Sequence, residues 1–310
     1  MSEHLQRWGG LGPRAILAAV LLLPLVAARC SEPTSGSGGD DMLVWRADTR
    51  ADRDAHGTPV ADDDRVYAVL QGVSAYNARD GSLAWRTPLE TYAPRNLSLG
   101  DGRVYAAEAT VHALDVKAGT VLWRFRPDAN ASLGRSAFAA GVLYFGTASH
   151  RVYALDAATG REMWRTDVGP EWQFESTVKG VVVSGDTVYA GADQWRAENG
   201  YIASGWLVAL DRTTGRVLWR FQTGAGNDRN SVSASPVVAG RLLLANDASS
   251  NAVFAVDRFT QQEVWRLRGE RGFVGFFEAP VVRGDTVYAA SGDAHAYAAD
   301  LATGRLLWRT

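Results

Sequence analysis

Short apolar runs alternate with polar stretches along most of this chain, and turn-forming residues separate them. Residues 152–155 read Val-Tyr-Ala-Leu, the next stretch contains Asp156, Thr159 and Gly160, and a second short run ends at Trp164. Runs of this length, bounded by Asp, Thr and Gly, are typical of β-strands joined by tight hairpins. The pattern therefore predicts an all-β fold of short antiparallel strands.

The same phrase recurs along the chain and ends each time on a tryptophan. From Trp45 onward, successive copies of this tryptophan are 40, 38, 41, 55, 46 and 43 residues apart. The full phrase, Ala-x-Asp-x-x-Thr-Gly-x-x-x-Trp, ends at Trp164, Trp219 and Trp308, and each copy follows two further apolar runs. Four short strands in about 40 residues are typical of one blade of a β-propeller.

The repeated tryptophans are predicted to be structural. An indole buries about 150–250 Å², and one per blade can fill the space between neighbouring blades. The small alanine of the phrase leaves room for it. Six complete repeats end on a docking tryptophan of this kind: Trp85, Trp123, Trp164, Trp219, Trp265 and Trp308.

The number of repeats does not decide how the ring of blades closes. Trp45 lies in an isolated strand of the fourth type, without the three strands that precede it in the other copies. Either six blades close with an additional edge strand, or the sequence is a shortened ring of seven or eight blades. The fold class is accordingly a β-propeller of six complete four-stranded repeats plus one extra N-terminal tryptophan strand.

The N-terminal region is typical of an export signal. Ala15 to Ala28 form an apolar run of fourteen residues that contains Pro24. This run is too short to span a bilayer. We expect residues 1–29 to be a signal peptide, residues 30–41 a flexible Gly/Ser linker, and residues 42–310 the propeller. The protein is thus expected to be exported to the periplasm or outer membrane.

Cys30 is the candidate lipidation site. Residues 26–30, Val-Ala-Ala-Arg-Cys, resemble a bacterial lipobox, although Arg29 departs from the small residue that normally precedes the modified cysteine. The alternative is cleavage after Ala28, which leaves Cys30 as a spare thiol. Lipidation would attach the protein to a membrane.

Composition excludes several function classes. The 32 Lys and Arg nearly balance the 34 Asp and Glu, so the net charge of −2 makes no electrostatic case for nucleic acid. A single cysteine rules out a disulfide within the chain and a cysteine-rich metal site. The five histidines form no ligand or catalytic motif, and we predict no catalytic, cofactor-binding or metal residues.

The tryptophan phrase resembles the docking motif of the pyrroloquinoline quinone (PQQ)-like propeller repeats, over about residues 42–310. This repeat occurs in quinoprotein dehydrogenases and in the eight-bladed BamB-type lipoproteins of outer-membrane β-barrel assembly. Dehydrogenases of this type need a calcium site, an aspartate base and adjacent cysteines. One cysteine cannot supply the pair, and the run from Asp62 to Asp64 is interpreted as a turn. The resemblance therefore implies a non-enzymatic scaffold without a cofactor.

Function is expected on one face of the ring. The loops between repeats and between second and third strands, here called the loop face, are long, variable and aromatic; the other end of the sheets is the turn face. We expect a monomer that binds a protein partner there, although these rings could instead plug the central channel. The alternatives are a PQQ-dependent dehydrogenase and an extracytoplasmic sensor or adhesion propeller. The candidate partner-binding residues are Trp172, Phe174, Trp195, Tyr201, Phe273, Phe276 and Phe277.

Overall fold

The computed structural model describes residues 45, 57–70, 72–89, 96–128, 133–169, 176–196, 201–223, 231–270 and 275–310. The chain divides into two units, Met1–Val44 and Trp45–Thr310, and all the described residues belong to the second. The predicted signal peptide, Cys30 and the linker lie outside the described residues. Within the described ranges, no helix is long and apolar enough to span a membrane.

The second unit contains six four-stranded antiparallel sheets. The first two sheets are β1 (Val60–Ala61), β2 (Arg65–Val69), β3 (Val73–Asn77), β4 (Leu83–Thr87), and β5 (Asn96–Gly100), β6 (Arg103–Ala107), β7 (Val111–Asp115), β8 (Val121–Phe125). The third and fourth are β9 (Ala137–Ala139), β10 (Val142–Gly146), β11 (Arg151–Asp156), β12 (Glu162–Asp167), and β13 (Ser176–Ser184), β14 (Thr187–Arg196), β15 (Tyr201–Asp211), β16 (Val217–Thr223). The fifth and sixth are β17 (Val237–Ala239), β18 (Leu242–Asp247), β19 (Ala252–Asp257), β20 (Gln262–Arg268), and β21 (Val281–Arg283), β22 (Thr286–Ala290), β23 (Ala296–Asp300), β24 (Leu306–Arg309).

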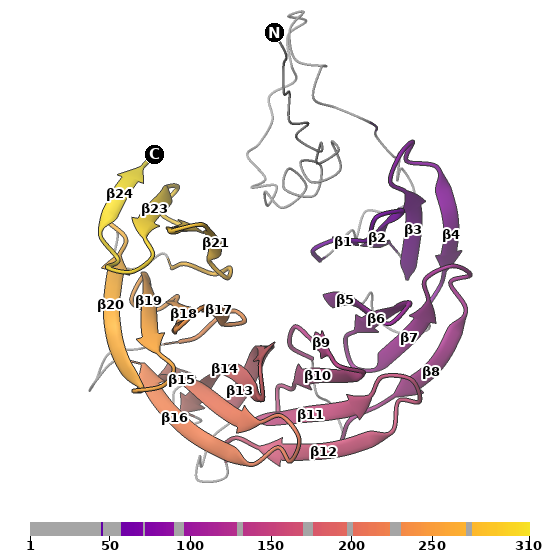
Figure 1. Cartoon of the computed structure of the whole chain (residues 1–310), viewed down its shortest axis with the longest axis horizontal. Helices are drawn as coiled ribbons and strands as arrows, with labels where there is room; N and C mark the ends of the chain where they lie inside the picture. Colours follow the sequence, from indigo (N-terminus) through magenta and orange to yellow (C-terminus); the bar gives the residue numbers. More distant parts are fainter. Residues whose placement is uncertain are drawn as a thin grey trace, which may run out of the picture. The chain divides into compact units, whose positions relative to one another are not determined.

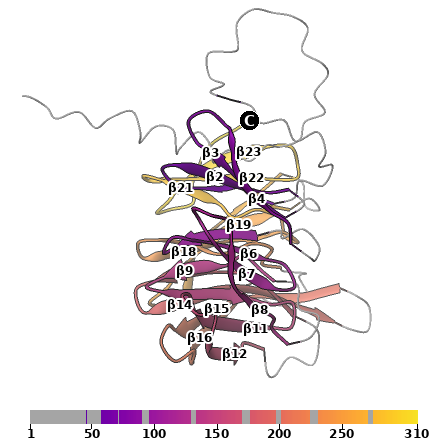
Figure 2. The same cartoon turned by 90° about the vertical axis from the view of Figure 1, so that its right-hand side faces the viewer.

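Each sheet pairs its strands in sequence order. Within the unit Trp45–Thr310, Figure 1 shows the first strand of every sheet on the inner side and the fourth on the outer side. The prediction of a β-propeller built from four-stranded antiparallel blades is confirmed. The longest strands are β14 and β15, and their hairpin extends beyond the neighbouring strands on the loop face (Figure 2).

The turn between the third and fourth strands explains the Asp, Thr and Gly of the repeat. Asp156 Oδ1 accepts hydrogen bonds from the backbone N–H (2.8 Å) and hydroxyl (2.7 Å) of Thr159. Gly160 follows with φ of 73°, a left-handed conformation that glycine adopts without strain. The threonine hydroxyl, followed by the backbone amide, holds the pKa of the Asp156 carboxyl below its usual range.

The turns of the second, third, fourth and sixth sheets each accept a hydrogen bond from the tryptophan of the preceding sheet. The Trp85 indole N–H on β4 donates to the carbonyl oxygen of Val116 (3.0 Å), which follows the turn aspartate of the second sheet. A Cβ at Gly119 would lie 2.5 Å from the Trp85 ring, so only glycine leaves room for the indole. The same donation joins Trp123 to Ala157, Trp164 to Arg212, and Trp265 to Leu301.

Trp45 occupies the equivalent site on the first sheet. Its indole donates to the Ala78 carbonyl (2.9 Å) and stacks on Tyr76, with centroids 6.5 Å apart. A Cβ at Gly81 would lie 2.4 Å from the Trp45 ring. Trp45 therefore makes the contact that a preceding blade would make, although no sheet of its own is described for it.

The hydrophobic core lies between successive sheets. Five apolar clusters fill the five junctions from the first sheet to the sixth. A tyrosine of the second strand is central to most of them and contacts the tryptophan of its own sheet, as Tyr67 contacts Trp85 at 5.9 Å. Burial raises the pKa of the Tyr105 phenol to about 12. His112 is buried in β7, as expected for a core residue.

Candidate functional site

Arg135 links three sheets on the loop face. It lies just before β9, and its Nη2 donates to the Thr58 hydroxyl (3.2 Å) and to Glu278 Oε2 (2.9 Å). Thr58 precedes β1, and Glu278 precedes β21. The side chains of Arg135 and Glu278 are 40% and 63% exposed, so water screens the pair and it adds about 0–1 kcal/mol. The pair remains accessible to hydrogen-bonding groups of another molecule.

A second ion pair lies beside it. Lys179 Nζ on β13 is 3.1 Å from Asp193 Oδ2 on β14, and the Asp193 side chain is almost fully buried. The Arg135 backbone N–H donates to the Lys179 carbonyl (3.0 Å), which places the two cationic residues on adjoining segments. The inner part of the loop face thus carries two cations, each paired with a carboxylate from a different segment.

A buried carboxylate orders the loop between β22 and β23. Asp293 accepts hydrogen bonds from the Tyr297 hydroxyl (2.7 Å) and the His295 backbone N–H (3.1 Å). Burial acts to raise the pKa of Asp293, but these hydrogen bonds, with others from Ser291 and Asn251, outweigh it and lower the pKa to about 2. This cluster holds the loop in shape.

Phe276 and Phe277 have opposite environments. Phe276 is fully buried and packs edge-on against Tyr297 at 5.3 Å, so its prediction as a partner-binding residue is wrong. The Phe276 carbonyl accepts hydrogen bonds from Asn246 and Ser233, which tie this loop to the fifth sheet. That anchoring turns the Phe276 ring inward. Phe277 is 57% exposed and remains available as a surface contact.

The other predicted aromatic residues are only partly described. Trp195 on β14 pairs with Ile202, and Tyr201 on β15 pairs with Arg196, in the hairpin that extends on the loop face. Trp172, Phe174 and Phe273 lie outside the described residues. Their place in a binding surface stays a prediction.

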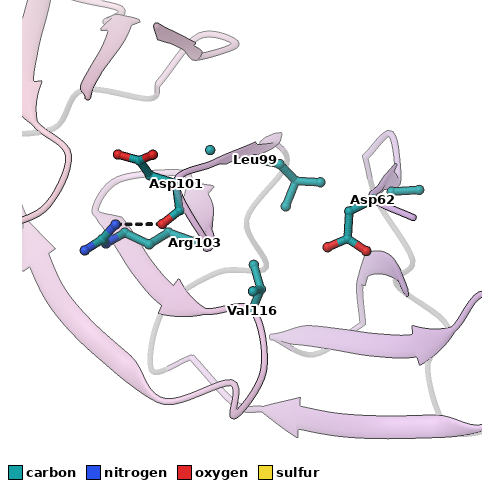
Figure 3. A pocket seen from close by; sticks show the side chains of 8 residues that line it. Asp62, Leu99, Asp101, Arg103 and Val116 are labelled. Carbon is teal, nitrogen blue, oxygen red and sulfur yellow. Dashed lines mark hydrogen bonds between the residues drawn. The ribbon is translucent and has the colours of Figure 1, made fainter. Parts of the chain in front are cut away.

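On the turn face, a cavity of about 310 Å³ lies between the first and second sheets. In Figure 3, Asp62, Leu99 and Val116 surround it, and Arg103 donates to the Asp101 carbonyl (2.8 Å). The Asp62 carboxylate accepts its hydrogen bonds from residues of its own sheet. It accepts from the Arg65 backbone N–H (2.8 Å) and from the Tyr67 hydroxyl (2.8 Å).

These contacts assign Asp62 a structural role. Burial, followed by the hydrogen bond to Asp62, raises the pKa of the Tyr67 phenol. A neighbouring cavity of about 520 Å³ is lined by charged turn residues, among them Asp64, Arg79 and Lys117.

The donor groups of the described residues do not fit a PQQ-and-calcium site. Calcium requires six to eight converging oxygen ligands, and within the described ranges no three His, Cys, Asp or Glu residues are grouped to hold a metal ion. The chain also has one cysteine.

The six repeated sheets and their tryptophan-to-turn contacts define a propeller of PQQ-like repeats. The family model described as "Outer membrane protein assembly factor BamB" matches residues 37–197 and 203–310. The chain belongs to this family. The resemblance to BamB-type PQQ-like propellers is therefore confirmed.

Known proteins of two other kinds are also similar. Quinohemoprotein alcohol dehydrogenase ADH IIB of Pseudomonas putida is 32% identical over 140 residues, which covers 41% of this chain and 19% of that protein. The serine/threonine-protein kinase AfsK of Streptomyces griseus is 29% identical over 309 residues, covering 97% of this chain and 34% of that protein. The chain thus spans about a fifth to a third of these relatives.

The crystal structure of BamB from Moraxella catarrhalis superposes with a TM-score of 0.50 at 19% identity, covering 81% of this chain and 84% of that one. At this identity the likeness shows the shared fold alone.

The two ion pairs of the loop face were not found from the sequence. Arg135 is 77 residues from Thr58 and 143 from Glu278, and none of the three belongs to the repeated phrase. Nothing in their spacing signals that they meet.

Proposed function

We propose that this protein is a non-enzymatic propeller scaffold that binds a protein partner in outer-membrane β-barrel assembly. Membership of the BamB family supports this proposal. The observation that carries it is the loop face, where an exposed phenylalanine, Phe277, adjoins the accessible Arg135–Glu278 pair. Aromatic and arginine side chains dominate the binding energy of many protein interfaces.

The turn face offers a matched comparison for this surface. Phe259, in the turn between β19 and β20, is 62% exposed and lies near the guanidinium groups of Arg258 (4.8 Å) and Arg241 (5.6 Å). It has the same residue type and a similar exposed fraction as Phe277, which is 57% exposed. The two residues differ in the face they occupy.

Site-specific crosslinking tests the proposal. A photoreactive phenylalanine analogue is placed at position 277 or at position 259, and the adducts formed in intact cell envelopes are identified by mass spectrometry. We expect an adduct between position 277 and a component of outer-membrane barrel assembly, and none with that component from position 259. Adducts from position 259 alone, or with unrelated proteins alone, would contradict the proposal.

We further propose that the protein is exported, monomeric and anchored through lipid on Cys30. The lipobox-like residues 26–30 support the anchor. Replacing Cys30 by serine should release the protein from the membrane fraction. Unchanged attachment of the C30S variant would remove the lipoprotein proposal and leave the scaffold proposal standing.

A PQQ-dependent dehydrogenase is the alternative function, which the partial similarity to quinohemoprotein alcohol dehydrogenase favours. Reconstitution with PQQ and calcium discriminates the two functions. Quinone absorbance that follows the protein on gel filtration, together with alcohol-dependent dye reduction, would establish the alternative. A scaffold shows neither.

A further inference from the structure

The fifth sheet departs from the other sheets at its turn-face end. Its two turns there, residues 240–241 and 258–261, are called the fifth-sheet tip. In each of the six sheets a backbone N–H of the second turn donates to a carbonyl of the first, and in the fifth sheet this bond joins Arg258 to Arg241 (3.1 Å). The recurring bond identifies the equivalent residues of the six tips, so each tip serves as a reference for the others.

Two positions of the fifth-sheet tip carry residue types that the other tips lack. The other five sheets have aspartate or glycine in the place of Arg241, namely Asp64, Gly102, Gly141, Asp186 and Asp285. They have no aromatic residue in the place of Phe259, which is taken by Arg79, Lys117, Ala158, Thr213 and Ala302. Among the six described tips, this one therefore combines an aromatic ring with an arginine on each turn.

These departures do not serve the stability of the fold. Phe259 is 62% exposed, so its ring contributes little buried area. Gln261 has a φ of 61° where the other five turns have glycine, and a left-handed conformation is strained for a residue with a side chain. Strained residues of this kind cluster at binding sites. The fifth-sheet tip is thus better suited to binding than to stabilising the propeller.

Two guanidinium groups lie beside the Phe259 ring. The Cζ atoms of Arg258 and Arg241 are 4.8 and 5.6 Å from the ring centroid. Arg258 Nη1 donates to the Tyr189 hydroxyl of the fourth sheet (3.3 Å), which fixes the first group. Arg241 Nε donates to Asp257 Oδ2, which fixes the second. Both groups are therefore oriented before a ligand arrives, and this lowers the entropic cost of binding.

Part of each guanidinium remains open to a ligand. The Arg241 side chain is 62% exposed, and its hydrogen bond to Asp257 uses Nε alone. Within the described ranges, the two Nη atoms of Arg241 and Nη2 of Arg258 have no acceptor. A guanidinium offers paired N–H groups that match the two oxygens of a carboxylate. The fifth-sheet tip thus places donors for a carboxylate next to an exposed apolar ring.

This chemistry favours an acidic protein segment over an anionic membrane. A basic residue near an anionic membrane surface contributes only about 1 kcal/mol, and stable attachment takes more than one signal. The net charge of −2 adds no long-range attraction to such a surface. A protein segment gains from both the carboxylate contact and the ring, because arginine and aromatic residues carry much of the binding energy at protein interfaces.

We propose that Phe259, Arg241 and Arg258 bind an acidic protein segment in which an apolar side chain adjoins a carboxylate. The carboxylate accepts hydrogen bonds from the open Nη groups, and the apolar side chain packs on the Phe259 ring. The site lies on the turn face, so this inference does not depend on the loop-face partner of the proposed function. A crosslink from position 259 to another protein, beside one from position 277 to an assembly component, agrees with both proposals.

Matched peptides test the proposed ligand. In these short synthetic peptides aspartate or asparagine alternates with leucine or serine, and their affinity for the full chain is measured by fluorescence anisotropy. We expect the aspartate–leucine peptide to bind at least fivefold more tightly than the aspartate–serine and asparagine–leucine peptides, because it alone carries both groups. No binding of the aspartate–leucine peptide, or equal binding of the asparagine–leucine peptide, would overturn the proposal.

Substitutions at the tip locate the site. Phe259→Ser and Arg241→Gln should each weaken binding of the aspartate–leucine peptide at least fivefold. Arg241→Lys keeps the charge but loses the planar fork, so it should weaken binding nearly as much as Arg241→Gln. Arg79→Gln and Leu83→Ser change exposed residues at the equivalent end of the first sheet and should leave binding unchanged. Equal losses in these controls, or full affinity in Arg241→Lys, would contradict the proposed site.

Lipid vesicles supply the remaining outcome. Co-sedimentation with vesicles of phosphatidylglycerol and phosphatidylcholine in equal parts is compared between the C30S variant, which has no lipid anchor, and the same variant carrying Phe259→Ser. Equal co-sedimentation of the two agrees with the proposal. Co-sedimentation that Phe259→Ser abolishes would show that the tip binds an anionic membrane, and would overturn the acidic protein segment as its ligand.

Discussion

On the turn face of the propeller the sheets repeat one set of contacts, whereas on the loop face the contacts differ from sheet to sheet. On the turn face, five tryptophan indoles donate to a turn carbonyl over nearly equal distances, 2.8–3.0 Å, and each of these five turns has a glycine beneath the ring. The loop face uses an ion pair through Arg135, a buried pair at Asp193, and a hydrogen-bonded aspartate at Asp293. The contacts that hold the sheets together therefore recur on the turn face, whereas each contact of the loop face occurs once.

This division has a physical cause. A turn that must receive an indole can vary little, since a Cβ in the glycine position would overlap the ring. The loops of the loop face do not receive a docked indole, so their sequences and contacts can differ from sheet to sheet. Binding surfaces commonly lie on loops held by a rigid scaffold, and this propeller separates the two in space.

The largest effect is expected for the tryptophans that dock on the turn face. Trp164→Ala removes a buried indole and its hydrogen bond to Arg212, and should lower the free energy of unfolding by about 3–5 kcal/mol. Denaturant titration measures it. Leu122→Ala, which removes a side chain from an exposed position of β8, is the control and should cost little. Equal costs would mean that the indoles do not hold the sheets together.

A smaller effect is expected at Asp293 on the loop face. Asp293→Asn places an amide among hydrogen-bond donors and should cost about 1–3 kcal/mol at neutral pH. Because the folded pKa of about 2 lies below the unfolded value, the ionised group stabilises the protein above about pH 4. This contribution is lost as the pH falls towards 2.

The variant should therefore show a flatter dependence of stability on pH than the parent between about pH 4 and 2. Asp257 on the turn face serves as the comparison. Its hydrogen bond from Arg241 also lowers the pKa to about 2, but the Arg241 side chain is 62% exposed to water. Asp257→Asn should cost less than Asp293→Asn, and the reverse order would contradict the buried role of Asp293.

The smallest effect is expected at the turn of the fifth sheet, where another residue stands in the glycine position. Gln261 holds the glycine position of the fifth sheet at φ of 61°, against 69–73° for the glycines of the other turns. A left-handed conformation strains a residue with a side chain, so Gln261→Gly should stabilise the protein by about 0.5–1 kcal/mol after glycine's entropy cost. Thermal unfolding measures the gain. A matched Thr260→Gly substitution should destabilise instead.

The sequence predicted more of the turn face than of the loop face. The phrase that ends at Trp164 predicts a docking tryptophan, a tight turn and a glycine beneath an indole. The structure confirms each of them, because the Trp164 indole donates to Arg212 and Gly160 lies beneath the Trp123 ring. On the loop face, Phe276 and Phe277 are adjacent aromatic residues, and the sequence pattern predicts the same partner-binding role for both. The hydrogen bonds to the Phe276 carbonyl decide that one ring is buried and the other exposed.

The sequence by itself determined the four-stranded blade, the order of its strands and the position of every docking tryptophan. These features depend on contacts that recur with each repeat, so the same few residue types must recur as well. Only the tertiary structure decided which loop residues meet, as when Arg135 reaches Glu278 143 positions away. Such contacts occur once and have no period in the sequence, because they depend on how successive blades bring distant loops together.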